Sequence, residues 1–240
     1  MLEFFQTLSW TAIFQIILID ILLGGDNAVI IALACRNLEK AQRMKGILWG
    51  TFGAIIMRVI LIAFALKLLE IPYLKIVGGV LLIWIGIKLL IPEEDEHGNV
   101  AGGTSVWTAV KTILIADFVM SLDNVIAIAA AAQKTTPGHE VAYVAFGLIV
   151  SVPIIIWGST LVLKLIDKYP LVITLGAGLL GWLAGGMLVS DVFTERTFFN
   201  GEHAPQTVKI AVEVIGVIVV VGLGKWLASR KGKSQVTETH

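Results

Sequence analysis

Seven long runs of apolar residues divide the chain, with only short polar linkers between them. A run of about 18 or more apolar residues carries a helix across roughly 30 Å of hydrocarbon. Strands of a membrane barrel would need only about ten residues each and would alternate apolar with polar side chains, so continuous runs predict helices. The predicted spans are residues 10–34, 46–69, 73–91, 107–132, 141–165, 171–190 and 209–228.

Composition supports one membrane domain over residues 1–240. Hydrophobic residues make up 57% of the chain and charged residues 15%, and the mean hydropathy is +0.87. These values are far from those of soluble domains and predict an all-α polytopic membrane protein embedded in a lipid bilayer. The formal net charge of zero gives no indication of a nucleic-acid partner. We expect neither an enzymatic activity nor an organic cofactor. Because residues 1–9 contain no Lys or Arg, we expect no cleavable signal peptide.

Basic residues predict the orientation. The linker after the first run contains Arg36, Lys40, Arg43 and Lys45, and such residues concentrate on the cytoplasmic side. The N-terminus is then outside, and the C-terminal tail, residues 229–240, is cytoplasmic. The acidic linker at residues 92–106 is also cytoplasmic, where we interpret it as a solvated connection. A metal-sensing role is the alternative, because this linker contains Glu93, Glu94, Asp95, Glu96 and His97.

An acidic motif occurs twice inside the apolar runs. Each of its three polar positions recurs at the same displacement (117 − 20 = 97), which also relates Gly50 to Gly147 and Gly79 to Gly176. The sequence therefore predicts a repeat of three spans, residues 10–91 and 107–190, followed by a seventh helix at 209–228. The motif residues are Asp20, Asp26 and Asn27 in the first copy, and Asp117, Asp123 and Asn124 in the second.

The odd number of spans per copy has a topological consequence. The second copy must enter the bilayer from the opposite side, which gives the inverted 3 + 3 repeat that is typical of secondary transporters. Inversion brings both motifs to the same depth. A carboxylate near the bilayer centre costs about 2.5–3.5 kcal/mol even on the lenient insertion scale, so four of them indicate a function. The alternative is that these side chains only hydrogen-bond helices together.

The chemistry of the doubled motif indicates a cation. Carboxylate and amide oxygens suit hard cations such as Mn²⁺, Mg²⁺ or Ca²⁺, and protons can replace the cation on the carboxylates. Exchange of a metal ion for protons is therefore a hypothesis. The pair Gly24 and Gly25 is expected to break the first helix and free backbone carbonyls, whereas the second copy has Ser121 there, with a hydroxyl.

Other polar residues in the runs have simpler interpretations. Arg58, in the middle of the second span, is predicted to form an ion pair with an aspartate; a gating or proton-coupling role is the alternative. Glu213 and Asp191 are predicted to lie at the membrane interface. Glycines concentrate in the third and sixth spans, where they allow close helix packing or, alternatively, form a sliding surface.

The two motifs, followed by Asn27-Ala-Val-Ile-Ile-Ala and Asn124-Val-Ile-Ala-Ile-Ala, resemble those of the TerC family of bacterial integral membrane proteins, and the likeness covers almost the whole chain. The resemblance implies a LysE-like transporter fold, residence in the cytoplasmic membrane and efflux of Mn²⁺. It also implies that Asp20, Asp26, Asn27, Asp117, Asp123 and Asn124 bind the ion. An association with the secretion machinery, supplying metal to exported proteins, is implied less firmly.

Two rival functions use the same features. An intramembrane aspartyl protease also needs two aspartates on different helices, but it usually shows Gly-x-Gly-Asp, and here Leu23-Gly24-Gly25-Asp26 lacks the first glycine. That chemistry also leaves the repeated asparagine unexplained. A membrane partner of the secretion machinery that does not transport is the other rival, and this role is compatible with transport.

Overall fold

The computed structural model describes residues 14, 17–18, 20, 25–69, 71–91, 105–132 and 140–237. Within these residues the regular structure is helical and contains no strand, which confirms the all-α prediction for this part of the chain. The helices are α3 (Gly25–Cys35), α4 (Lys40–Leu69), α5 (Leu74–Leu90), α6 (Val106–Ala132), α7 (Glu140–Lys168), α8 (Leu171–Val189), α9 (Val192–Phe198) and α10 (Gln206–Thr237).

Six of the seven predicted spans coincide with helices from α4 onward, and the differences lie at polar ends. Helix α4 begins at Lys40 rather than at residue 46, and α10 continues to Thr237 rather than ending at 228. Lys, Arg and Gln are good helix formers, so the helix continues beyond the apolar run. Helix α3 covers the second half of the predicted first span, and the short α9 was not predicted. The acidic linker, apart from Ser105 and Val106, lies outside the described residues.

Four segments of the described helices are long and apolar enough to cross a membrane. They are Lys40–Ile62, Val144–Lys168, Leu171–Val189 and Gln206–Arg230. Helix α5, at 17 residues, is slightly shorter than a full span, and α6 contains Lys111, Asp117 and Asp123. The chain therefore has several apolar helices suited to a bilayer, while the count of seven spans stays a prediction.

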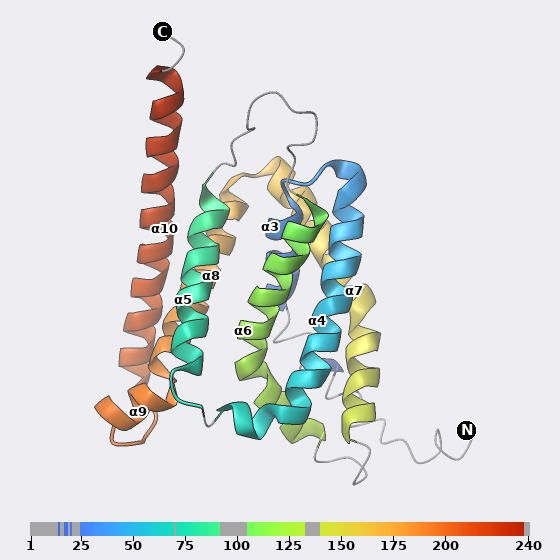
Figure 1. Ribbon diagram of the computed structural model, residues 1–240, viewed down its shortest axis with the longest axis vertical. Coiled ribbons are helices and arrows are strands. Elements are labelled where there is room, and N and C mark those ends of the chain that lie inside the picture. The colour runs from blue at the N-terminus through green and yellow to red at the C-terminus, as the bar shows by residue number, and fades with distance from the viewer. Residues whose placement is uncertain are drawn as a thin grey trace, which may run out of the picture.

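Consecutive long helices run in alternating directions (Figure 1). The α3–α4 turn, the α7–α8 turn and the end of α10 lie at one end of the molecule, and the α4–α5 turn and α9 lie at the other. Each helix of the predicted second copy, α6, α7 and α8, thus runs opposite to its counterpart α3, α4 or α5. Opposite directions are what an inverted repeat requires, although the repeat itself stays a prediction.

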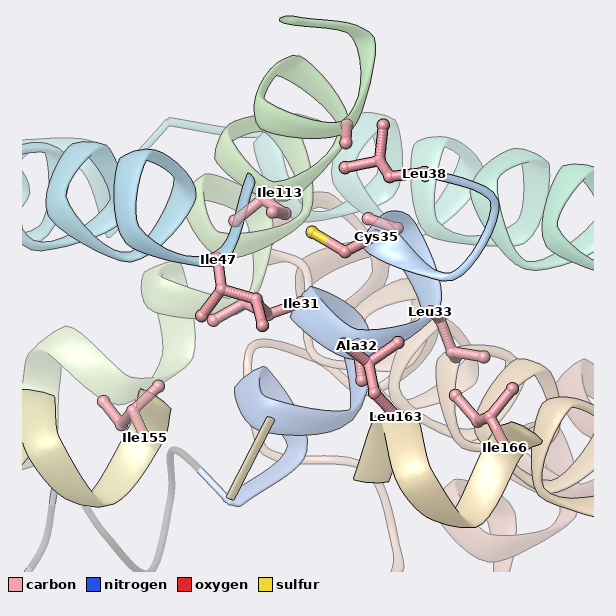
Figure 2. Packing of buried hydrophobic residues seen from close by; sticks show 12 residues of the cluster. Ile31, Ala32, Leu33, Cys35, Leu38, Ile47, Ile113, Ile155, Leu163 and Ile166 are labelled. Carbon is pink, nitrogen blue, oxygen red and sulfur yellow. The ribbon is translucent and has the colours of Figure 1, made fainter. Parts of the chain in front are cut away.

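Helix α3 lies at the centre of the packing. It contacts α7, α6, α4 and α8, and almost every residue from Asn27 to Cys35 is buried. Figure 2 shows its side chains Ile31, Leu33 and Cys35 among apolar side chains of α4, α6 and α7. A helix that is apolar on all sides is buried on all sides. Asn27 of the first acidic motif is part of this buried helix.

The glycines of α8 allow its backbone to touch the backbone of α10. A Cβ atom added to Gly181 would lie 2.5 Å from the carbonyl oxygen of Gly216, and one added to Gly185 would lie 2.6 Å from that of Val212. A Cβ at Gly79 of α5 would lie 3.0 Å from the carbonyl oxygen of Ala184 in α8. The close-packing interpretation is confirmed, and the sliding-surface alternative stays a prediction.

Asp191 joins the starts of two helices. Its Oδ1 accepts hydrogen bonds from the backbone N–H of Phe193 in α9 (2.8 Å) and of Tyr73 before α5 (3.0 Å), and its Oδ2 accepts one from Lys75 (3.0 Å). The side chain is fully buried in the protein, while its predicted depth at the membrane interface stays a prediction. A carboxylate with two oxygens can satisfy several free N–H groups at helix starts, which explains its burial.

Replacing Asp191 with Ala should lower the free energy of unfolding by about 1–3 kcal/mol, because several buried N–H donors lose their acceptor. Thermal unfolding of the purified protein in detergent measures this loss. Asp191→Asn keeps one oxygen acceptor and should lose less. An alanine variant as stable as wild type would contradict the capping role.

Candidate functional site

Arg58 of α4 bridges the first aspartate of each motif. Its Nη1 donates to Oδ1 of Asp20, and its Nη2 donates to Oδ1 of Asp117 at 2.5 Å. All three residues are almost completely buried, with exposed fractions of 4% for Arg58, 1% for Asp20 and 5% for Asp117. The predicted ion pair is therefore confirmed, and it involves two carboxylates rather than one. A planar guanidinium suits this arrangement because its N–H groups point in fixed directions.

Two serine hydroxyls complete the network. Ser121 of α6 donates to Oδ2 of Asp117 at 3.3 Å and accepts from Nε of Arg58 at 3.2 Å. Ser151 of α7 donates to Oδ2 of Asp20. Each carboxylate thus receives one hydrogen bond from the guanidinium and one from a hydroxyl, which offsets part of the cost of burying it. Four segments distant in sequence meet in this polar cluster.

The two aspartates of the network are equivalent in the sequence repeat, but the residues that bind them are not. Asp20 and Asp117 occupy the same position in the two sequence copies, but the counterpart of Arg58 is Ile155 (58 + 97 = 155). The counterpart of Ser151 is Ala54 (151 − 97 = 54). Comparing the copies therefore could not find Ser151, which sequence analysis missed; its only signal was a hydroxyl within an apolar run.

Asp26 and Asn27 lie at the start of α3, beside this network. Asn27 is buried, with an exposed fraction of 4%, and Asp26 is partly buried. Within the part of the chain that the structure describes, Asp26 Oδ1 and both polar side-chain atoms of Asn27 have no hydrogen-bond partner. A buried polar atom without a partner costs about 1–3 kcal/mol, so such atoms are rare unless a ligand uses them. Asp26 also lies close enough to Arg58 and Asp117 to interact with both electrostatically.

The second motif lies on a continuous helix. Helix α6 runs unbroken from Val106 to Ala132, so Ser121, four residues after Asp117, shares its face and reaches its carboxylate. Asn124 is partly buried, and the side chain of Asp123 lies outside the described part. In the first copy, Gly24 falls outside the described residues, so the break predicted at Gly24-Gly25 stays a prediction. The predicted local difference between the two copies stays a prediction as well.

Glu213 of α10 is buried between helices. Its side chain is buried, with an exposed fraction of 6% for the residue, and packs against Gly186 of α8. Lys209, one turn earlier in α10, has its Nζ 4.0 Å from Oε1. The glycines of α8 leave room for the carboxylate between the helices, while its depth at the membrane interface stays a prediction.

The described oxygens form two groups with different partners. The carboxylates of Asp20 and Asp117 are neutralised by Arg58, whereas Asp26 and Asn27 retain unpaired atoms. Among the described residues, no three His, Cys, Asp or Glu side chains come together as a group that could hold a metal ion. The guanidinium of Arg58 bridges the two equivalent aspartates.

Comparison with known proteins identifies similar chains. The family model described as "Integral membrane protein TerC family" matches residues 5–233. The uncharacterized membrane protein YjbE of Bacillus subtilis (strain 168) is 43% identical over 203 residues, which cover 85% of this chain and 88% of that protein. The uncharacterized membrane protein YceF of the same organism is 30% identical over 135 residues, about half of each chain (52% and 52%).

A more distant relative is longer than this chain. The UPF0053 inner membrane protein YoaE of Escherichia coli (strain K12) is 24% identical over 242 aligned positions, covering 92% of this chain but 43% of that protein. No solved structure matches this chain.

Proposed function

Because the chain belongs to the TerC family of integral membrane proteins, we propose that it is a secondary transporter that exports Mn²⁺ from the cytoplasm in exchange for protons. The observation that carries this proposal is a buried acidic cluster shared by the two sequence copies, in which Asp26 Oδ1 and Asn27 Oδ1 have no hydrogen-bond partner among the described residues. An oxygen-only set suits hard divalent cations, and carboxylates can exchange such a cation for protons. The relatives' names specify membrane proteins and no substrate.

The packing supports a site between two inverted copies. Helix α4 packs on α6, and its counterpart α7 packs on α3, which is the counterpart of α6. Helix α5 packs directly on its own counterpart α8. Together with the opposite helix directions in Figure 1, this pattern supports an inverted repeat, a fold in which substrate sites lie near the bilayer midplane.

The ends of the helices support an orientation with the N-terminus outside and the C-terminus in the cytoplasm. The α3–α4 turn, the α7–α8 turn and the last part of α10 lie at the same end (Figure 1). These segments contain Arg36, Lys40, Lys168 and Arg230. Basic residues near helix ends favour the cytoplasmic side, so this end is the one from which Mn²⁺ would enter.

Asp26→Asn should lower Mn²⁺ export by at least about tenfold, because it removes one of the charges that attract the cation while leaving the side chain's size unchanged. The measurement is manganese content and manganese tolerance of bacteria that lack other exporters and express either protein at equal membrane levels. Asp26 Oδ1 bonds to no other side chain in the described residues, so the variant should fold normally.

Asp167→Asn is the matched control, because it makes the same chemical change on a carboxylate that is half exposed and paired with Arg43 on the surface. This control should export Mn²⁺ like wild type. Export by Asp26→Asn at the wild-type rate would overturn the proposed ion site. An additional role as a membrane partner that supplies metal to exported proteins would be compatible with transport.

A further inference from the structure

We propose that Arg58 is a tethered counter-cation, which occupies the place between Asp20 and Asp117 that the transported cation takes during the transport cycle. The cation then binds by displacing the guanidinium, and the guanidinium returns to expel the cation. This inference rests on the proposed function and adds a regulatory element to the same site. It differs from a structural ion pair, which would stay closed throughout transport.

The geometry places Arg58 where a shared cation would bind. The Nη1 and Nη2 atoms of one guanidinium contact the equivalent Oδ1 atoms of Asp20 and Asp117. A cation held by both carboxylates would lie in the same space. Two cations cannot occupy this buried site together, because like charges repel strongly where water does not screen them. Binding of the cation and pairing of Arg58 are therefore mutually exclusive.

In the described network, one residue, Arg58, competes with the transported cation for the two aspartates. The counterpart of Arg58 in the second copy is Ile155, so the described network contains one guanidinium for two equivalent aspartates. A single positive charge leaves this cluster acidic, since Asp26 also lies within electrostatic range of Arg58. A divalent cation supplies twice the charge of the guanidinium and can therefore compete for both carboxylates.

A neighbouring hydroxyl can hold the displaced guanidinium. Ser121 Oγ accepts from Arg58 Nε independently of the two aspartates' contacts with Nη1 and Nη2, so the stem of the side chain keeps an anchor. This hydrogen bond reduces the cost of separating the buried guanidinium from its carboxylates.

The two roles of Arg58 predict opposite effects on cation affinity. A structural pair holds the site together, so its removal would weaken binding. A competitor lowers the apparent affinity by the fraction of molecules in which it occupies the site, so its removal tightens binding. Cation affinity therefore separates the roles, whereas loss of transport alone would not.

The test measures equilibrium binding of radiolabelled Mn²⁺ to the purified full-length protein in lipid nanodiscs. We expect Arg58→Gln to bind Mn²⁺ at least about tenfold more tightly than wild type, because no guanidinium competes for the carboxylates. Its export of Mn²⁺ from cells should fall by at least about tenfold, because nothing expels the bound ion. Arg58→Lys keeps a positive charge but loses the two fixed N–H contacts, so its affinity should lie between those of wild type and Arg58→Gln.

A second pair of variants keeps the test valid if Arg58→Gln alone does not fold. The single variant Asp20→Asn is compared with a combined variant that carries Asp20→Asn and Arg58→Gln. The combined variant lacks one carboxylate and the guanidinium together. The combined variant should bind Mn²⁺ more tightly than Asp20→Asn alone, because Asp117 is freed from Arg58. Unchanged or weaker binding in the folded Arg58→Gln protein or in the combined variant overturns the inference. If wild type binds Mn²⁺ and exports it while these variants fail, only the inference is wrong; if wild type does neither, the proposed function is wrong as well.

Discussion

A protein carrying both Asp20→Asn and Asp117→Asn should lose about 3–5 kcal/mol of unfolding free energy, the loss typical of breaking a buried ion pair from one side. Arg58 would remain in the interior without either of its carboxylates, and its exposed fraction of 4% prevents water from replacing them. Both substitutions keep the size of the side chain, so packing changes contribute little. Tryptophan fluorescence during thermal or denaturant unfolding in detergent measures the difference.

Restoring charge balance is the control for this prediction. Adding Arg58→Met to the double variant removes the unpaired charge, and the triple variant should recover most of the lost stability, because an apolar replacement of a complete ion-pair network is often neutral. Asp117→Asn alone should cost less than the double variant, since Asp20 still pairs with Arg58. If the double variant unfolds like wild type, the bridge contributes nothing to the folded state.

Gly216→Val should separate α8 from α10 and lower the free energy of unfolding by at least about 1–3 kcal/mol, the usual range for overpacking. A Cβ atom at Gly216 would lie 2.1 Å from the carbonyl oxygen of Gly181, a distance at which backbone atoms must move. Because α8 also packs on α5, the displacement affects a second interface. The measurement is the midpoint of thermal unfolding together with the yield of monodisperse protein in detergent.

Gly222→Val on the same helix is the matched control. Nothing lies within 4 Å of a Cβ atom added at Gly222, so the same change in helix propensity occurs there without a clash. This variant should stay within about 0.5 kcal/mol of wild type. Equal stability of the two valine variants would show that the α8–α10 contact tolerates a side chain and that the close approach is not required.

Local sequence was sufficient to predict the helices. Inside a bilayer every backbone N–H and C=O must find its partner within the same segment, so a continuous apolar run such as 171–190 specifies a helix without knowledge of its neighbours. The structure places α8 at Leu171–Val189. The short helix α9 was missed because its start depends on the side chain of Asp191, which also binds the start of α5.

The sequence by itself determined the helical class, the repeated acidic motif and the family, because these depend on composition and spacing along the chain. Only the tertiary structure decided which of the acidic residues share a partner. Arg58 contacts carboxylates 38 and 59 residues away, and Ser151 reaches Asp20 across 131 residues. Which faces of apolar helices meet depends on the fit of side chains between helices, and glycine contacts such as Gly181 with Gly216 set how closely they approach.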